Sequence, residues 1–192
     1  APGFRTLDLA WLPFGDSIKL DPDREIPSEM VRVKGGALNL EYGAGLASAP
    51  TIELGDFLMD RLEVTNAEYR AFADSGGYQR PEFWEDPFVK DGRTLTWRQA
   101  VALMTDRTGR PGPATWEAGD YPAGQGNYPV GGLSWYEAAA YAKFRGKALP
   151  SVYHWQRAAT LPLAASINAR SNFSSVGPRV GGREENLSGF GT

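Results

Sequence analysis

Residues 129–159 carry the start and stop signals of a short helix, and this punctuation constrains the fold more than any other feature. Ser134 and Glu137 have the spacing of a capping box, in which a hydroxyl and a carboxylate each satisfy a backbone N–H of the first turn. Gly146 follows the apolar run and can adopt the left-handed conformation that ends a helix. The pattern therefore predicts a helix over residues 135–145.

A second helix follows directly in the same stretch. Ser151 is a suitable N-cap, and Trp155, Ala158 and Ala159 recur at three- and four-residue spacing, which places them on one helical face. A tryptophan ring is too large to leave fully exposed on a short helix. We therefore expect Trp155 to pack into the core.

Two further capping boxes predict two more helices. Thr65 with Glu68 begins one helix, and Thr96 with Gln99 begins another that we expect to end at Gly109. Each is a serine- or threonine-type cap followed three residues later by Glu or Gln, so the prediction rests on local chemistry alone.

Short strands are predicted before and between these helices. Residues 30–34 and 37–42 flank the dipeptide 35–36, whose two glycines suit a tight hairpin. A longer strand is expected over 51–64, with Gly55 as a bulge. Short capped helices, short strands and much irregular loop together predict an α+β domain.

Length, composition and charge exclude several classes of protein. The 192 residues suffice for one domain with its own core, and the hydrophobic content of 42% argues against disorder. The formal charge of -3 is small and both signs are interspersed, so we expect no nucleic-acid partner. No apolar run is long enough to span a bilayer, and no signal peptide is visible, so the sequence leaves the localisation unknown.

Few residues offer catalytic or metal-binding chemistry. The chain has no cysteine, which removes disulfides, thiolate ligands and thiol catalysis from it. Its one histidine, His154, cannot build a multi-histidine site alone, and we expect it to be a hydrogen-bonded structural residue. The carboxylates are explained by caps, strand ends and solvated faces, so we predict no catalytic residue.

Four blocks of sequence, in a fixed order, carry a family resemblance. Residues 30–36, 57–66 and 129–159, together with Asn172 and Phe173, resemble the formylglycine-generating enzyme (sulfatase-modifying factor) family. The resemblance implies the complex, loop-rich C-type-lectin-like fold of that family. In the family, the equivalent of the ending at Thr192 leads into further core sequence, so we expect the domain to be C-terminally incomplete here.

The resemblance also suggests a domain organisation. Residues 30–192 are expected to form the N-terminal part of the formylglycine-generating-enzyme-like domain, truncated at its end. Within residues 1–29, apolar and polar residues alternate at 6–11 before a proline-rich, charged run, which indicates the tail of a preceding β segment plus a linker. A strand packed on the same domain is an equally good interpretation.

Aromatic residues gather between the first predicted helix and the 129–159 stretch. Trp84, Phe88, Trp116 and Tyr128 are candidates for a recognition surface, because aromatic loops give large contact area at low entropic cost. The alternative is that these rings fill an irregular core, and we weigh that alternative more heavily.

A calcium site is implied by the resemblance alone. In the formylglycine-generating enzyme, an asparagine side chain and the following carbonyl help to bind calcium, and they match Asn172 and Phe173. Calcium needs six to eight oxygen ligands, so Asn172 as a loop-stabilising residue is the alternative. No other cofactor is expected from this chain.

Two hypotheses of function follow. The oxidase chemistry of the founding enzyme depends on a cysteine pair that binds copper, and this chain has no cysteine. Residues 78–84, 87–89, 110–116 and 152–155 look most like copies of the domain appended to bacterial serine/threonine protein kinases. The first hypothesis is therefore a non-catalytic binding or sensory domain of such a signalling protein, with an unknown protein or small molecule as its ligand.

The second hypothesis is an enzyme. The chain would be the scaffold half of a metal-dependent thiol oxidase that generates formylglycine, or of a related sulfur-oxidising enzyme. The relatives that oxidise sulfur compounds with iron use several histidines, so this hypothesis needs cysteines or histidines from beyond residue 192.

Overall fold

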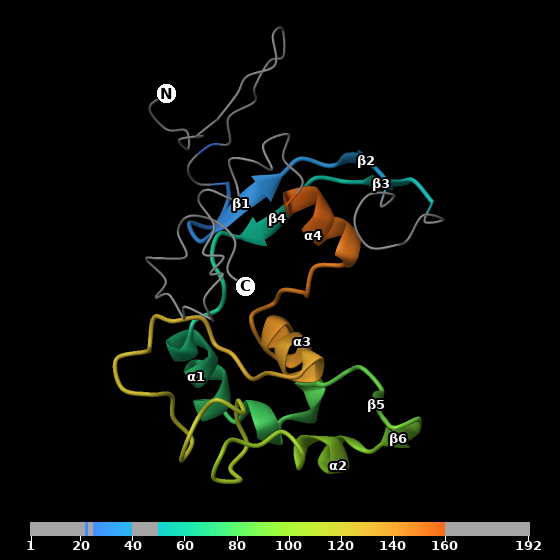
Figure 1. Cartoon of the computed structure of the whole chain (residues 1–192). Helices are drawn as coiled ribbons and strands as arrows, with labels where there is room; N and C mark the ends of the chain where they lie inside the picture. The colour runs from blue at the N-terminus through green and yellow to red at the C-terminus, as the bar shows by residue number, and fades with distance from the viewer. Residues whose placement is uncertain (1–21, 23–24, 40–49, 160–192) are drawn as a thin grey trace, which may run out of the picture. The chain divides into compact units, whose positions relative to one another are not determined.

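The computed structural model describes residue 22 and residues 25–39 and 50–159 (Figure 1). The chain divides into two compact units. The first unit contains the described residues up to Leu62 and from Pro150 onward, and the second contains Glu63–Leu149. The boundaries 1–29 and 30–192 that we expect from the sequence remain a prediction.

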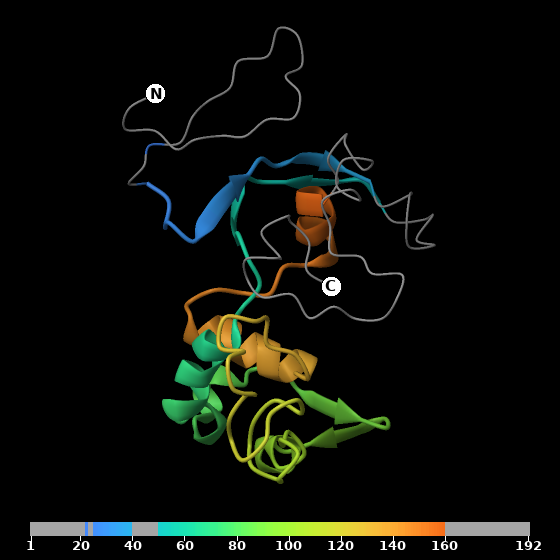
Figure 2. The same cartoon turned by 60° about the vertical axis from the view of Figure 1, so that its left-hand side comes forward.

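The first unit is built on two pairs of antiparallel strands. Strand β1 (Met30–Val33) pairs with β4 (Phe57–Asp60), and β2 (Gly36–Leu38) pairs with β3 (Ile52–Leu54). The two pairs follow one another along a ribbon, as Figures 1 and 2 show. The prediction that β1 and β2 form a hairpin is therefore wrong.

The geometry around Gly35 explains why the chain continues here instead of reversing. A Cβ atom at Gly35 would lie 2.1 Å from the carbonyl oxygen of Leu54, so only glycine fits between the two strand pairs. The Gly35 N–H donates to Oδ1 of Asp56 at 3.0 Å. This bond joins the interruption between β1 and β2 to the interruption between β3 and β4. Gly55 lies at that second break, where the sequence predicts a bulge.

Helix α4 (Val152–Ala159) lies beside this ribbon. Ser151 caps it as predicted, because its Oγ accepts the backbone N–H of His154 at 3.3 Å. The His154 ring packs edge-on against Phe57 with 4.8 Å between ring centroids. One helical turn later, Arg157 donates to the carbonyl oxygen of Gly35 at 2.6 Å. These contacts define the face of α4 that meets the ribbon.

Trp155 does not lie on that face, and the prediction that it packs into the core is wrong. Its side chain is 57% exposed. Because His154 and Arg157 are three residues apart, they share one face of the helix, and Trp155 points to another. Ala158 and Ala159 are half-buried.

The second unit contains three α-helices among its described residues. These are α1 (Asn66–Asp74), α2 (Trp97–Val101) and α3 (Trp135–Phe144), joined through the 3₁₀ turns η1 (Gly77–Gln79) and η2 (Pro81–Phe83). All three α-helices begin with the capping boxes that the sequence predicts, and Gly146 takes the left-handed conformation (φ 66°) after α3. A hairpin of β5 (Phe88–Lys90) and β6 (Arg93–Leu95) completes the unit.

Helix α2 ends at Val101, short of the predicted end at Gly109, and a polar loop follows it. The carboxylate of Asp106 accepts the backbone N–H groups of Thr108 at 2.7 Å and Arg110 at 3.0 Å. An aspartate that bonds its own following backbone in this way competes with helical hydrogen bonding. These bonds hold residues 106–110 in a turn, so the helix, which ends at Val101, does not resume before Gly109.

The core of the second unit is predominantly aromatic. Tyr69 and Phe72 on α1 are fully buried, and the Tyr69 ring stacks on Tyr141 of α3 with centroids 5.3 Å apart. The core cluster comprises Tyr69, Phe72, Tyr78, Trp84, Phe88, Ala100, Val101, Trp116, Ala140 and Tyr141. Helices and small antiparallel sheets occur together, which is compatible with the predicted α+β class; the finer C-type-lectin-like assignment remains a prediction.

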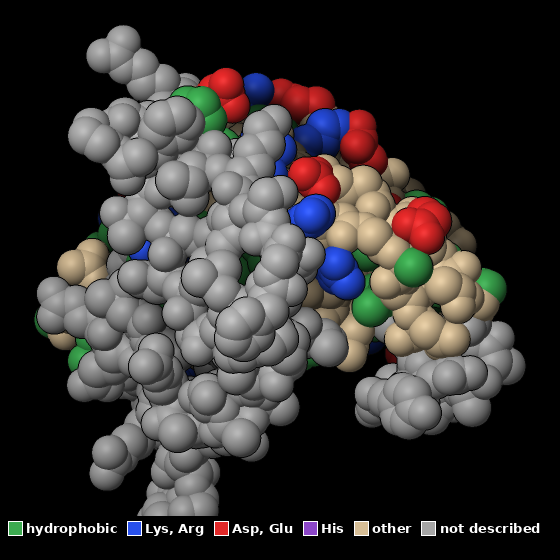
Figure 3. Space-filling model, turned by 90° about the horizontal axis from the view of Figure 1, so that it is seen from above, with side chains coloured by type: hydrophobic (Ala, Val, Ile, Leu, Met, Phe, Trp, Pro, Cys, Tyr) green, Lys and Arg blue, Asp and Glu red, His purple; other side chains and the backbone are tan. Residues whose placement is uncertain are grey.

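Two surface properties bear on possible partners. On the face seen in Figure 3, acidic and basic side chains lie next to one another and form no large patch of one sign. No helix in the described part of the chain has the length and hydropathy that crossing a bilayer requires.

Candidate functional site

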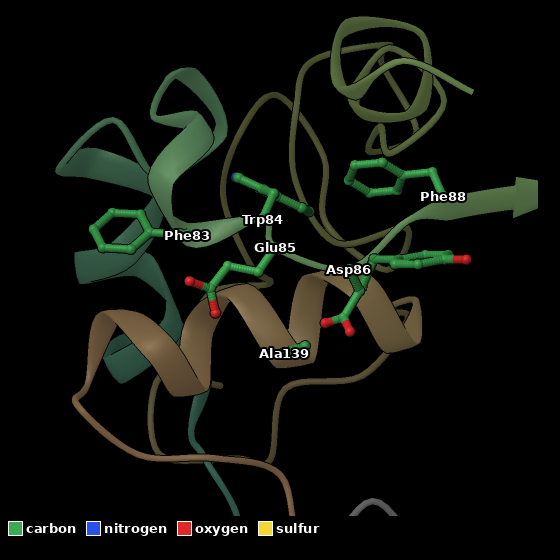
Figure 4. A pocket seen from close by; sticks show the side chains of 7 residues that line it. Phe83, Trp84, Glu85, Asp86, Phe88 and Ala139 are labelled. Carbon is green, nitrogen blue, oxygen red and sulfur yellow. The ribbon is translucent and has the colours of Figure 1, made fainter. Parts of the chain in front are cut away.

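A shallow depression in the second unit lies between η2, the start of β5 and helix α3. Its empty volume, open solvent included, is about 150 Å³. The lining residues are Phe83, Trp84, Glu85, Asp86, Phe88, Tyr136 and Ala139. Figure 4 shows the rings of Trp84 and Phe88 on one side and the carboxylates of Glu85 and Asp86 extending toward α3.

Trp84 and Phe88 are the two predicted recognition residues that the structure brings together. Their ring centroids are 6.2 Å apart, and the side chains are 8% and 5% exposed. The indole N–H of Trp84 donates to the carbonyl oxygen of Gly77 at 2.9 Å, which fixes the ring. Both rings belong mainly to the core and present only an edge to the depression.

Trp116 and Tyr128 lie at a different place in the unit. Trp116 is 1% exposed, and its indole N–H donates to Oδ1 of Asn66 at 2.9 Å. The Asn66 amide donates in turn to the carbonyl oxygen of Tyr128 at 3.2 Å. This burial corrects the surface interpretation of Trp116 and favours core packing, because a buried, hydrogen-bonded indole leaves no face for a ligand.

The acidic residues of the depression are the ones that sequence reasoning missed. Glu85 forms an ion pair with Lys143 of α3, whereas Asp86 makes no hydrogen bond or ion pair with any residue that the structure describes. The sequence does contain a signal that could have drawn attention to Glu85 and Asp86. These two adjacent carboxylates interrupt the aromatic run 83–88.

A buried polar network joins α1, η1 and α3. The Tyr78 hydroxyl donates to Oε1 of Glu137 at 2.6 Å, and the Tyr69 and Tyr78 hydroxyl oxygens are 3.0 Å apart. Burial raises the pKa of both tyrosines, and the neighbouring Glu137 raises it further. Because the phenols stay neutral and are enclosed, the network holds three elements together and offers no acid–base group to solvent.

The Asp106 loop is the second polar feature, and it too is structural. Burial by itself raises the pKa of Asp106, but bonds from the Thr108 hydroxyl and from the N–H groups of Gly119, Arg110 and Thr108 outweigh it and lower the pKa to about 2. Both carboxylate oxygens are engaged by protein donors, at 2.6 Å from Gly119 and 2.7 Å from Thr108. The geometry suits a loop anchor and not a cation ligand.

His154 is held by local contacts, as expected. Its Nδ1 lies 2.6 Å from Oγ of Ser151. Within residues 25–39 and 50–159, no three His, Cys, Asp or Glu side chains come together in a group able to hold a metal. Asn172 and Phe173 lie outside the described residues, so the calcium site remains a prediction from the resemblance.

Comparison with known proteins tests the family that the sequence blocks suggest. The sequence model described as "Sulfatase-modifying factor enzyme 1-like domain" matches residues 17–176. The chain therefore belongs to the formylglycine-generating enzyme family, as its sequence blocks predict.

Individual relatives fall into three kinds. The chain is 30% identical to a hercynine oxygenase of Mycolicibacterium smegmatis over 68% of this chain and 29% of that protein. It is 30% identical to a formylglycine-generating enzyme of Thermomonospora curvata over 71% of this chain and 50% of that protein. It is 29% identical to the serine/threonine-protein kinase Pkn1 of Chlamydia trachomatis, over 69% of this chain and 19% of that protein. The chain thus spans half or less of each of these relatives.

Proposed function

We propose that this chain is a non-catalytic, formylglycine-generating-enzyme-like binding or sensory domain of a larger bacterial signalling protein, a serine/threonine protein kinase. The observation that carries the proposal is the absence of cysteine from all 192 residues, together with a single histidine. A family member that oxidises a thiol through a cysteine pair would have to draw both cysteines from outside this chain.

The contacts of His154 support the same proposal. Its ring is already engaged with Ser151 at 2.6 Å and with Phe57 at 4.8 Å between centroids. An iron site built from several histidines therefore has no donor set in this sequence. The kinase half of the proposal is supported by the relative named as serine/threonine-protein kinase Pkn1.

The fold proposal accompanies the functional one. We infer the complex C-type-lectin-like fold of the family, whose irregular loops on a small mixed scaffold suit ligand recognition. Within the second unit, residues 75–96 and 102–133 are mostly 3₁₀ turns, a small hairpin and irregular loops packed around α1 and α3. A protein or a small molecule is the expected class of ligand.

The alternative is that the chain is the scaffold half of a metal-dependent thiol oxidase or a related sulfur-oxidising enzyme. Relatives named as formylglycine-generating enzyme and hercynine oxygenase favour it. The chain spans 29% and 50% of those two proteins, so residues supplied from elsewhere would have to complete the site.

One experiment separates the two. The complete protein that contains this chain is produced and assayed for phosphate transfer from ATP and for conversion of a cysteine-containing peptide to its aldehyde, followed by mass spectrometry. Phosphate transfer without aldehyde formation is the expected result. Aldehyde formation would overturn the non-catalytic proposal, and a complete sequence without kinase motifs would remove its signalling half.

A further inference from the structure

Four oxidisable aromatic rings lie in a line through the core of the second unit. The ring centroids of Trp84 and Tyr78 are 5.6 Å apart. The hydroxyl oxygens of Tyr78 and Tyr69 are 3.0 Å apart, and the centroids of Tyr69 and Trp116 are 6.0 Å apart. Indole and phenol rings give up a single electron more readily than other side chains apart from the thiol of cysteine, and the chain has no cysteine. An electron vacancy created on one ring can therefore pass to the next.

The hydrogen bonds within this line have one direction. Tyr78 donates its hydroxyl proton to Oε1 of Glu137 at 2.6 Å, so the hydroxyl of Tyr69 is the donor in its contact with Tyr78. Oε2 of Glu137 accepts the N–H of Ser134 at 2.7 Å, which holds the carboxylate in place. The series of bonds runs from Tyr69 through Tyr78 and ends at a base.

The base matters because a phenol that loses an electron must also lose its proton. Burial raises the pKa of Tyr78, and its side chain is 3% exposed, so the proton is not released to water. A carboxylate oxygen at 2.6 Å has the distance that a proton acceptor needs. The O–H proton of Tyr78 thus has a destination inside the core.

The two indoles of the line have no such acceptor. The N–H of Trp84 donates to the carbonyl oxygen of Gly77, and that of Trp116 donates to the amide oxygen of Asn66, each at 2.9 Å. Amide oxygens are too weakly basic to take a proton at neutral pH. An electron vacancy that starts on either indole is therefore held best at Tyr78.

We propose that Tyr78 is a redox-active tyrosine, a site of one-electron oxidation coupled to proton transfer. A one-electron oxidant at the exposed edge of Trp84 takes an electron from the indole, and Tyr78 replaces that electron. The O–H bond of Tyr78 breaks, and its proton forms an O–H bond at Oε1 of Glu137. The products are a neutral Tyr78 phenoxyl radical, a neutral Glu137 carboxylic acid and the oxidant reduced by one electron.

The surroundings of Tyr78 protect such a radical. The Tyr69 hydroxyl continues to donate to the oxygen of Tyr78, and the packed rings keep other molecules away from it. The site holds one oxidising equivalent until a reductant supplies an electron and Glu137 returns the proton. This redox activity is separate from the binding role proposed above and does not depend on it.

The test is photochemical oxidation of the full chain, with tris(bipyridine)ruthenium as the oxidant and a cobalt(III) ammine as the electron acceptor, followed by rapid freezing and EPR spectroscopy. A tyrosyl radical signal should form and should outlast the signal from the same chain unfolded in urea, where the enclosure is lost. High-field EPR of the folded chain should show one environment, with a hydrogen bond donated to the phenoxyl oxygen.

Variants assign the radical to its residue. Tyr78→Phe should abolish the long-lived signal. Tyr136→Phe is the matched control, because the Tyr136 hydroxyl of the same unit donates to the carbonyl oxygen of Pro87 and not to a carboxylate, and it should keep the signal. Glu137→Gln removes the base but keeps a side chain able to cap a helix, as Gln99 does in α2, and it should slow radical formation roughly 10²-fold. Circular dichroism checks that each variant is folded.

The proposal is refuted if the folded chain forms no long-lived tyrosyl signal, if the signal persists in folded Tyr78→Phe, or if Glu137→Gln forms it at the parent rate. If Tyr78→Phe does not fold, the high-field spectrum of the parent chain decides, because a spread of water-exposed environments would contradict an enclosed radical. None of these results alters the outcome of the assay of phosphate transfer and aldehyde formation.

Discussion

Removing the Tyr78 hydroxyl should destabilise the second unit far more than the loss of one oxygen atom suggests. The side chain is 3% exposed and donates to Glu137 at 2.6 Å, a hydrogen bond to a carboxylate. A bond to a charged group contributes roughly 1.5–3 kcal/mol, and an unpartnered buried hydroxyl costs roughly 1–3 kcal/mol. Tyr78→Phe removes the hydrogen bond to Glu137 and leaves the buried hydroxyl of Tyr69 without its partner.

Because such terms are not additive, we expect Tyr78→Phe to lower the free energy of unfolding by about 2–4 kcal/mol. Tyr69→Phe removes only the neutral bond at the end of the network, so its cost should be about 0.5–1.5 kcal/mol. Ser134→Ala breaks the cap of α3 but leaves the Tyr78 bond intact, and its cost should be about 1 kcal/mol.

The assay is equilibrium urea denaturation followed by tryptophan fluorescence, with the slope checked for constancy between variants. The double variant Tyr69→Phe, Tyr78→Phe should cost little more than Tyr78→Phe alone, because the two hydroxyls act through one another. A Tyr78→Phe variant no less stable than Tyr69→Phe would refute the reasoning, since the carboxylate bond would then contribute nothing.

Three further outcomes are expected. Gly77→Ala should cost about 1–3 kcal/mol in urea denaturation, because a Cβ there would lie 2.3 Å from the Phe72 ring, whereas Gly55→Ala, with no atom within 4 Å, should be nearly neutral. The pKa of Asp106 falls from 3.8 to about 2 on folding, so its contribution to stability is complete above pH 4 and is lost between pH 4 and 2. Asp106→Asn should therefore flatten the dependence of melting temperature on pH in that window, and an unchanged slope would contradict this. Trp155→Ala should change stability by no more than about 0.5 kcal/mol because the ring is 57% exposed, and a loss of several kcal/mol would show that it is buried.

The helices of the second unit could be predicted from sequence because their caps are local. Thr65, Thr96 and Ser134 each bond a residue only three positions away, and all three capping boxes are present. The loop that follows α2 was less predictable, since it is closed at Asp106 by Gly119, thirteen residues further on. Nothing in the run around Gly109 indicates that partner.

Strand pairing and burial depend on distant residues, and there the sequence was insufficient. The two glycines at 35–36 suit a hairpin locally, yet Leu54 and Asp56 decide that the chain continues past them. Likewise Trp116 and Trp135 are the same residue type in the same aromatic region, but only Trp116 meets Asn66, fifty residues earlier. The Trp116 ring is therefore part of the core, whereas the Trp135 ring is 56% exposed.

The capping boxes of α2 and α3 have the same spacing, but the side chains at their third positions make different hydrogen bonds in the folded structure. In α2, one oxygen of Gln99 accepts both the backbone N–H and the hydroxyl of Thr96, so a neutral amide suffices there. In α3, Oε2 of Glu137 accepts the N–H of Ser134 while Oε1 accepts the hydroxyl of Tyr78. Only a carboxylate offers two acceptor oxygens at once. The spacing of Glu137 from Ser134 is explained by the capping of α3. Its identity as a carboxylate, by contrast, is required by the bond to Tyr78 in the core.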